Sequence, residues 1–196
     1  MQTEDVIEKF KAAGALLEGH FLLTSGLHST KYLQCALVLQ HPREAEAFGR
    51  AIAEHFKNKR IELVASPAIG GLIIGHEVAR ALGARFVWTE RADGAMTLRR
   101  GFSVRPGEQT LVVEDVLTTG GSTRETITAL RAAGAEVIAA ASIIDRSSGK
   151  ADVGAPRLSL ATLSVPAVEP VDCEACKRGE VATKPGSRGP SYERSN

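Results

Sequence analysis

Long apolar runs, aromatic residues and an excess of either charge are all scarce in this sequence. No run of about 18 apolar residues is present, so a membrane-spanning helix is not expected. Lys and Arg total 24 against 23 Asp and Glu, and a net charge of +1 gives no field that would attract nucleic acid or a membrane surface. The N-terminus, MQTEDVIEKF, opens with acids instead of the basic and apolar segments of a signal peptide. We therefore expect a cytoplasmic protein with neither nucleic acid nor membrane as its partner.

Cysteine is scarce as well. Three cysteines, an odd number, are more typical of reduced thiols in a chain of 196 residues than of a disulfide framework. Cys173 and Cys176 form a C-x-x-C pair, but a zinc site needs two further ligands. The five histidines show no metal-ligand spacing, and Cys35 is the only other thiol, so closure would require a second chain. The preferred interpretation is a specific contact made by the C-terminal segment, with structural zinc and redox pairing as alternatives.

Short β-rich runs alternate with helix-length segments through the middle of the chain. Strands are predicted for ELVAS, ARFVW, QTLVVE and EVIAAASIID, and helices are predicted over residues 42–56, 70–82 and 122–134. Continuously apolar strands separated by helices are typical of a parallel sheet that is covered on both faces. The predicted fold class is therefore α/β, with a mainly parallel sheet flanked by helices.

The two ends of the chain differ from this middle part. A helix is expected to run from Thr3, its N-cap, to about Gly14. Residues 20–26 and 31–39 are expected to be strands or extended segments around a Ser-Gly turn. From about Pro166 the chain has four prolines, mixed charge and few large apolar residues, which is typical of an extended segment.

These patterns predict how the chain is divided. A single domain is expected over residues 1–165, and an extended tail over residues 166–196. The tail is not expected to form a second core, because it has too few large apolar side chains.

The segment LVVEDVLTTGGST, residues 111–123, joins an apolar strand, two acids and a turn of Thr, Gly and Ser. In open α/β sheets, ligands bind where the carboxyl ends of strands lead into helices. A glycine-rich turn at that place points N–H groups into one concavity at a helix N-terminus, which suits a phosphate. Glu114 and Asp115 would repel that phosphate but suit vicinal hydroxyls or a magnesium ion. The segment therefore indicates a ribose 5-phosphate ligand, although the acids taken alone also fit a solvated strand end.

Two other phosphate motifs do not match the chain. The P-loop requires Gly-Lys-Ser/Thr, and TTGGST has no lysine. The dinucleotide fingerprint G-x-G-x-x-G is present in neither PAIGGLIIG nor LTTGGST.

The segment VVEDVLTTGGST resembles the phosphoribosyl-diphosphate motif of the type I phosphoribosyltransferases. The segments GHFLLTSGLHSTKYLQ, SPAIGGLIIGHEVARALG, TERADGAMTLRRGF and SIIDRSSG follow the order and spacing of the orotate-specific branch, over roughly residues 14–150. CEACKRGEVATKPGSR also resembles the tail of one bacterial group in that branch. The resemblance implies the type I fold, with a small N-terminal hood from about residue 1 to 40. It also implies the transfer of phosphoribosyl to orotate in pyrimidine biosynthesis, with release of diphosphate.

The resemblance assigns roles to individual residues. Glu114 and Asp115 would hold the ribose hydroxyls of 5-phosphoribosyl 1-diphosphate (PRPP). PRPP would carry Mg²⁺ into the site, and Asp115 is the candidate protein ligand for this ion. Arg146 would bind orotate, since its planar fork of donors suits a carboxylate. The remaining predicted orotate contacts are Ser25, Gly26 and Thr118. The predicted PRPP-binding residues are Gly70, Gly71, Arg91, Glu114, Asp115, Val116, Leu117, Thr118, Thr119, Gly120, Gly121 and Ser122.

The sequence departs from better-known members of the family at two positions. Some members carry lysine where this chain has Thr24 and Gly70, so positive charge for the diphosphate must come from elsewhere. RADGAMTLRR, residues 91–100, lies where the family has a mobile basic lid, and an exposed hairpin with solvated charge is the alternative. Which arginine replaces the lysine stays open. The predicted catalytic residues are Glu114, Asp115, Arg99 and Arg100.

Three functions are compatible with these residues. The leading one is phosphoribosyl transfer to orotate, the second is transfer to a purine or another base, and the third is regulation by a binding protein without turnover. Arg146 and the LLTSG…KYLQ segment favour the first over the second, because both match the orotate-binding pattern of the family, and purine bases lack the carboxylate that Arg146 suits. The acidic pair and the basic lid argue against the third. The resemblance further implies a homodimer in which the lid of one chain covers the site of the other.

Overall fold

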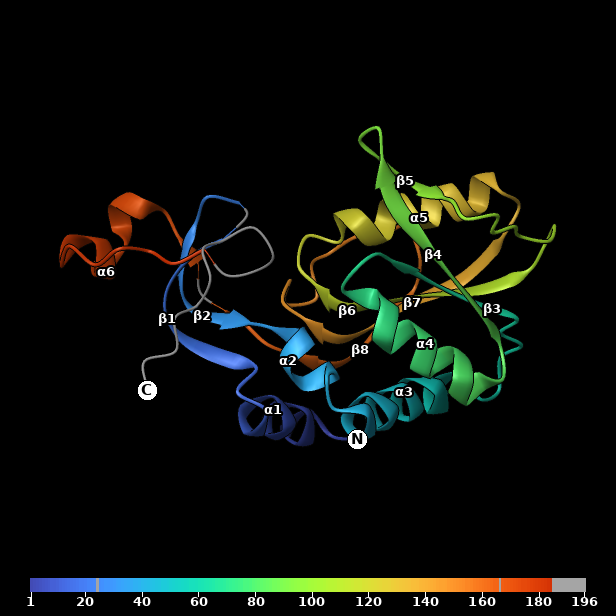
Figure 1. Ribbon diagram of the computed structural model, residues 1–196, viewed down its shortest axis with the longest axis horizontal. Coiled ribbons are helices and arrows are strands. Elements are labelled where there is room, and N and C mark those ends of the chain that lie inside the picture. The colour runs from blue at the N-terminus through green and yellow to red at the C-terminus, as the bar shows by residue number, and fades with distance from the viewer. Residues whose placement is uncertain (24, 166, 185–196) are drawn as a thin grey trace.

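The computed structural model describes residues 1–23, 25–165 and 167–184, and its largest element is a six-stranded sheet (Figure 1). The strand order is β5-β4-β3-β6-β7-β8, and every neighbouring pair is parallel except β4 and β5. The prediction of an α/β fold with a mainly parallel sheet is confirmed. The strands are β3 (Leu63–Pro67), β4 (Arg85–Ala92), β5 (Ala95–Leu98), β6 (Gln109–Leu117), β7 (Glu136–Asp145) and β8 (Arg157–Thr162).

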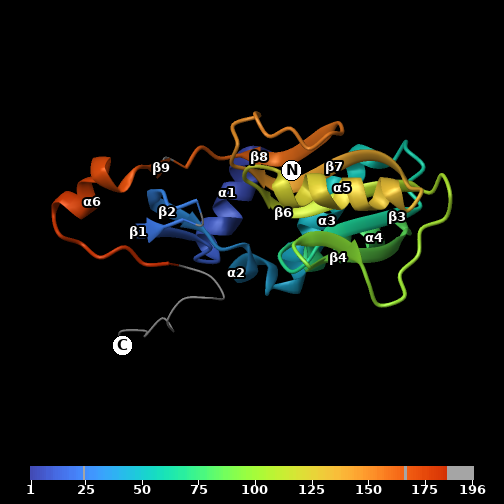
Figure 2. The ribbon, with the colours of Figure 1, turned by 90° about the horizontal axis from the view of Figure 1, so that it is seen from above.

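Helices cover both faces of this sheet (Figures 1 and 2). Helices α3 (Pro42–Phe56) and α4 (Gly71–Leu82) pack on one face, and α5 (Gly121–Ala132) packs on the other. Successive strand residues alternate between the faces, so Leu111 belongs to the cluster under α3 and α4 while Val112 belongs to the cluster under α5. Because both faces are buried, the central stretches 63–65 of β3 and 111–113 of β6 are apolar at every position.

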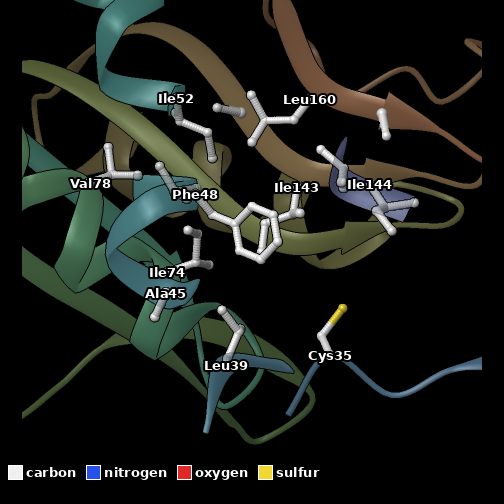
Figure 3. Close-up of a cluster of buried hydrophobic side chains, with 14 of the residues drawn as sticks. Cys35, Leu39, Ala45, Phe48, Ile52, Ile74, Val78, Ile143, Ile144 and Leu160 are labelled. Carbon is white, nitrogen blue, oxygen red and sulfur yellow. The ribbon is translucent and has the colours of Figure 1, made fainter. Parts of the chain in front are cut away.

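The larger apolar cluster connects the sheet to the N-terminal helices (Figure 3). Phe48 of α3, Ile74 of α4 and Ile143 of β7 are fully buried in it. Burying a side chain of this kind contributes about 1.5–3 kcal/mol. The same cluster includes residues from α1 (Thr3–Ala12) and α2 (Cys35–Leu39), so the start of the chain is anchored to the main sheet.

The helical N-terminal segments differ from the sequence predictions in two details. Thr3 is the first helical residue of α1 and not its N-cap; Gln2 is the N-cap, and its N–H donates to the Asp5 carboxylate at 2.9 Å. Residues 35–39, predicted as extended, form α2, in which Cys35, Val38 and Leu39 are buried at helical spacing. Five apolar residues in a row do not distinguish a short helix from a strand, which explains the wrong prediction.

A separate three-stranded sheet lies at one end of the molecule, beyond the edge of the main sheet (Figures 1 and 2). Its strands β1 (Leu16–Leu22) and β2 (His28–Leu33) form an antiparallel hairpin, and β9 (Ala167–Val168) pairs with β2. The turn η1 (Pro170–Asp172) and helix α6 (Glu174–Lys177) follow β9.

The C-terminal segment is bound along this hairpin as far as it is described. Thr183 donates its N–H to the His20 carbonyl at 2.8 Å and accepts from the Leu22 N–H at 2.9 Å. Cys173 and Ala175 are buried, but neither belongs to the two large apolar clusters. Residues 166 and 185–196 of the predicted tail lie outside the described residues, and the division at residue 165 stays a prediction. Within the described ranges, no helix is long and apolar enough to cross a membrane.

A buried acid closes the amino end of β6. The side chain of Glu108 is fully buried and accepts hydrogen bonds from the Arg85 guanidinium at 2.7 and 2.9 Å. Arg105 donates to the same carboxylate from its backbone N–H at 3.0 Å and from its side chain at 2.8 Å. Arg85, together with Arg105 and against the effect of burial, lowers the pKa of Glu108 to about 2. This ion pair ties the start of β6 to the start of β4.

Candidate active site

Three strands end side by side at the opposite edge of the sheet. The register pairs Ala65 of β3 with Val112 of β6, and Leu117 of β6 with Asp145 of β7. The chain segments after these strands therefore leave the sheet next to one another, and the Arg146 N–H donates to the Leu117 carbonyl at 2.7 Å. The structure thus brings together three parts of the predicted site, which are Gly70 with Gly71, the segment from Glu114 to Ser122, and Arg146.

Glu114 and Asp115 lie within β6, not after it, because the strand continues to Leu117. The Thr123 hydroxyl, at the start of α5, donates to the Glu114 carboxylate. Asp115 accepts from the Val116 N–H at 2.9 Å and also from the Cys35 thiol. Each acid therefore has few hydrogen-bond donors for a carboxylate held in a largely buried place.

Burial dominates the ionisation of both acids. It raises the pKa of Glu114 to about 7, with the neighbouring charge of Asp115 adding to the effect and the Thr123 hydrogen bond opposing it. Burial also raises the pKa of Asp115, against the hydrogen bonds from Val116 and Cys35. Two carboxyls so poorly compensated favour a ligand that brings hydroxyl donors or a cation.

Gly70 and Gly71 lie between the end of β3 and α4, against the acids. A Cβ atom at Gly70 would lie 2.7 Å from one carboxylate oxygen of Asp115, so a side chain here would require the Asp115 carboxylate to move from its present position. A Cβ atom at Gly71 would lie 3.0 Å from the Val113 carbonyl. The backbone of this loop can therefore approach the acids, and a ligand held by them, more closely than any side chain would permit.

The segment from Thr118 to Ser122 forms a loop at the N-terminus of α5. Gly120 has φ 78° and a Cβ there would lie 2.8 Å from Val153, so both backbone and space require glycine. Thr118, Thr119 and Gly121 are exposed, and the first turn of α5 contains no acid. Hydroxyls, backbone N–H groups and the positive end of a helix dipole are the features that would suit an anion, and the binding role of this loop stays a prediction.

Among the described residues, the cationic side chain of Arg146 forms no ion pair with an acidic side chain. Its guanidinium is half-buried, and within the described residues its buried Nε has no hydrogen-bond partner. Burial lowers the pKa of Arg146, opposed by the charges that Tyr32 and Cys35 can carry. Such a group favours an anionic ligand that would supply the missing acceptors.

Sequence reasoning did not assign a role to Tyr32 or Cys35. Both lie close enough to Asp115 and Arg146 for the charges of these two residues to act on their pKa values, which burial raises. They come from the end of β2 and the start of α2, so the N-terminal segment supplies one wall of the site. The segment KYLQ belongs to the stretch that resembles the orotate-binding pattern of the family, but the resemblance assigned no individual role to Tyr32 or Cys35.

The predicted basic lid is a hairpin formed by β4 and β5, which projects from the edge of the main sheet (Figure 1). Arg91 forms an ion pair with Glu125 at 2.8 Å, and Arg100 forms one with Glu90. Within the described part of the chain, Arg99 has no ion-pair partner. Arg99 is therefore the hairpin arginine whose charge remains available to a ligand.

Ser25 and Gly26, the other predicted orotate contacts, lie in the turn between β1 and β2. Their hydrogen bonds are local: the Gly26 N–H donates to the Leu23 carbonyl at 3.0 Å, and the Leu27 N–H donates to the Ser25 hydroxyl at 3.4 Å. The hairpin that carries them lies beyond the edge of the main sheet (Figures 1 and 2). The predicted contact of this turn with orotate stays a prediction.

An acidic pair beside an anion-binding loop, at the carboxyl edge of a parallel sheet, defines a class of protein that binds phosphorylated sugars. The family model for the phosphoribosyl transferase domain matches residues 36–174 of this chain, and the chain belongs to that family. Its relatives carry a narrower name. An orotate phosphoribosyltransferase from Pelotomaculum thermopropionicum is 51% identical over 188 residues, covering 96% of this chain and 99% of the relative.

Two further proteins of the same name are similar to this chain. The orotate phosphoribosyltransferase of Thermotoga maritima is 50% identical over 186 residues, covering 95% of this chain and 98% of that protein. The crystal structure of orotate phosphoribosyltransferase from Aeropyrum pernix is 27% identical, with a TM-score of 0.66, and the match covers 81% of this chain and 93% of that one.

The raised pKa of Glu114 predicts a measurable cost to stability. A carboxyl that titrates near 7 in the folded state and near 4.5 when unfolded takes up a proton on folding, so its contribution is most favourable below pH 4.5 and is lost as pH rises through 7. Glu114→Gln should therefore increase the free energy of unfolding at pH 8, by on the order of 2 kcal/mol, and change it little at pH 4.5.

Urea denaturation at the two pH values measures this difference. Glu136→Gln, which makes the same change at an exposed position on β7, serves as the control and should alter neither value by more than about 0.5 kcal/mol. A Glu114→Gln protein less stable than the original at pH 8 would show that the ionised acid is well compensated.

Proposed function

We propose that the protein transfers the 5-phosphoribosyl group of PRPP to orotate, giving orotidine 5′-phosphate and diphosphate. The observation that carries the proposal is the position of Arg146, half-buried and without a described hydrogen-bond partner for Nε, at the strand edge that carries the acidic pair. A ligand for this site must bring a phosphate, hydroxyls and a second anion. PRPP supplies the first two and orotate supplies the third.

PRPP fits the site group by group. Its 5-phosphate suits the loop from Thr118 to Ser122, and its ribose hydroxyls suit Glu114 and Asp115. The diphosphate suits the loop at Gly70, where an absent side chain leaves backbone N–H groups accessible. Hydroxyl donors to the acids would replace the solvation that burial removes from them.

The reaction requires charge placement more than a protein nucleophile. A ring nitrogen of orotate forms a bond to C1 of the ribose while the bond from C1 to the diphosphate oxygen breaks, and the electron pair leaves with diphosphate. Positive charge develops on the ribosyl group, and Glu114 and Asp115 lie where they would stabilise it. Fixing both substrates at one sheet edge also removes much of the entropic barrier.

Magnesium is part of the proposal. Carboxylate oxygens are the protein ligands that this ion prefers, and Asp115, with few hydrogen-bond donors and a pKa raised by burial, fits that role. Bound to the diphosphate, the ion would neutralise charge on the leaving group.

The choice of base follows from Arg146. Its guanidinium can hold a carboxylate through two parallel hydrogen bonds, and adenine, hypoxanthine and uracil offer no carboxylate. Tyr32 lies near enough to this guanidinium for its charge to act on the pKa of Arg146. A purine substrate would leave Arg146 buried and unpaired, which disfavours that alternative.

We further propose that the protein is a cytoplasmic homodimer in which the hairpin of β4 and β5 covers the partner's site. The hairpin projects away from its own sheet (Figure 1), and Arg99 on it is available to bind diphosphate. A lid of this kind brings positive charge to the leaving group and excludes water only while substrate is bound. A binding protein without turnover would not need such a lid.

The decrease of orotate absorbance in the presence of PRPP and Mg²⁺ tests the function. Orotate should be consumed, while adenine, hypoxanthine, xanthine and uracil should not. Asp115→Asn keeps nearly the same shape but removes the charge, so kcat/KM should fall well beyond tenfold, a loss of more than about 1.4 kcal/mol of transition-state stabilisation. Unchanged kinetics in a folded Asp115→Asn protein would remove this carboxylate from the mechanism.

Arg146→Ala tests the base-binding role separately. Truncating one partner of a buried charged pair costs about 2–5 kcal/mol, so orotate binding should weaken by at least about thirtyfold while PRPP binding changes much less. Arg131→Ala removes an exposed arginine at the end of α5 and serves as the control. Isothermal titration with each substrate gives both affinities, and equal damage to the two would assign Arg146 to the phosphate or to the fold.

Mixed dimers test the lid. An Arg99→Ala/Arg100→Ala chain and an Asp115→Asn chain should each be nearly inactive as pure dimers. A mixed dimer contains one site with an intact Asp115 and an intact partner lid, so mixing should restore up to about half of the activity of an unmodified dimer. If native mass spectrometry shows heterodimers but the activity stays at the parental level, the hairpin does not act on the partner's site.

A further inference from the structure

Four potential metal ligands converge where the C-terminal segment meets the β1–β2 hairpin. They are His20 on β1, His28 on β2, and Cys173 and Cys176 at the start of α6. One ligand atom from each residue lies within 4.8 Å of all the others. His28 and Cys173 are buried, and His20 and Cys176 are partly buried.

The distances between these atoms are close to those of a tetrahedral zinc site. Zinc bonds of about 2.3 Å to sulfur and 2.0–2.1 Å to nitrogen place neighbouring N and S ligands about 3.6 Å apart. Here His20 Nε2 lies 3.4 Å from the Cys173 sulfur and 3.7 Å from the Cys176 sulfur. His28 Nδ1 lies 3.2 Å from the Cys176 sulfur and 2.8 Å from His20 Nε2. The nitrogen–nitrogen distance is shorter than a bound ion requires by about half an ångström, and the distance from His28 Nδ1 to the Cys176 sulfur is shorter by about 0.4 Å, so small shifts of the His28 ring would accommodate the ion.

Hydrogen bonding alone does not explain this arrangement. Between two neutral imidazoles only one ring can donate at the point of contact, and a thiol is a weak donor and a weak acceptor. Four electron-rich atoms would thus face one another in a partly buried place with a single good hydrogen bond among them. The two cysteines are free thiols, so a disulfide does not account for their position either. A cation at the centre would satisfy all four atoms.

The surrounding backbone holds the ligands in place from both sides. Before the cysteines, β9 pairs with β2 so that Val168 faces His28. After them, Thr183 hydrogen-bonds to His20 and Leu22 on β1. The C-x-x-C spacing then places both sulfurs on one side of the first turn of α6, as neighbours three apart on a helix are.

The C-terminal segment has little else to hold it in place. Helix α6 has four residues, too few to be stable without tertiary contacts. None of the residues from 167 to 184 belongs to the two large apolar clusters, and Val171 and Val181 are 77% and 90% exposed. A bound metal is one of the ways in which small structures without a sufficient core are stabilised.

We infer that His20, His28, Cys173 and Cys176 bind one zinc ion, which joins the C-terminal segment to the N-terminal hairpin. Two sulfur and two nitrogen ligands at tetrahedral spacing are typical of structural zinc. Four protein ligands leave no coordination position for a substrate, so the ion has a structural role. The inference corrects the expectation that a zinc site would require a second chain, because two histidines of the same chain complete it.

The zinc content of the full chain, purified without an affinity tag from zinc-supplemented medium, tests the inference. Inductively coupled plasma mass spectrometry should find about one zinc per chain, and less than about a tenth of that in Cys176→Ser and His28→Asn. Cys35→Ser and His55→Asn remove a cysteine and a histidine outside the cluster and should keep the ion. Full zinc content in Cys176→Ser, or none in the folded original protein, would overturn the assignment.

Two measurements on the unaltered sequence keep the test valid if a variant fails to fold. X-ray absorption at the zinc edge should show two sulfur and two nitrogen neighbours, and a shell of oxygen and nitrogen alone would contradict the site. Trypsin should cleave after Lys177 and Arg178, which are exposed on the C-terminal segment, at least tenfold faster once a chelator has removed the metal. Cleavage that is equally fast with and without the chelator would show that no ion holds this segment.

Discussion

Two carboxylates on a strand that is buried on both faces form the constraint on which the site depends. Glu114 and Asp115 directly follow the buried run of apolar residues 111–113 in β6, and they are themselves only partly exposed to water. Their neighbours are adapted to this position: Gly70 has no side chain, and Thr123 donates a hydroxyl hydrogen. The protein thus keeps two poorly solvated charges until a ligand with hydroxyls or a cation arrives.

A glutamate lies near each end of β6, and the surroundings shift the pKa values of the two in opposite directions. At the amino end, Glu108 is held by Arg85 and Arg105, and its pKa is lowered to about 2. At the carboxyl end, Glu114 has no cationic partner among the described side chains, and its pKa is raised to about 7. An acid with arginine partners stabilises the fold, whereas an acid without them is costly to the fold and available to a ligand.

The parts of the site that a single stretch of sequence carries were predictable. The strand, the acids and the loop from Thr118 to Ser122 are contiguous, and parallel topology alone places Arg146 at the same edge as these groups. The family resemblance added the assignment of orotate. The positions of Tyr32 and Cys35 were not predictable, because they depend on how the N-terminal segment packs against the sheet.

The cluster of two histidines and two cysteines could not be predicted from the sequence either, because its members are far apart along the chain. His20 and Cys173 are 153 residues apart, so no local spacing links them. Neither the two histidines nor the two cysteines indicate a metal site by themselves, and the pairing of β9 with β2 brings them together.

The basic hairpin is an intermediate case. Its charges were visible in the sequence, but the pairing of Arg91 with Glu125 and of Arg100 with Glu90 depends on tertiary structure.

The small sheet made by β1, β2 and β9 combines the earliest and the latest parts of the chain. A ribosome makes the first two strands long before the third, and a hairpin of two strands is marginally stable alone in water. The last strand of the main sheet, β8, ends only a few residues before β9 begins, so the two sheets receive their last strands at nearly the same stage of synthesis. The hairpin therefore stays two-stranded until all six strands of the main sheet have been made.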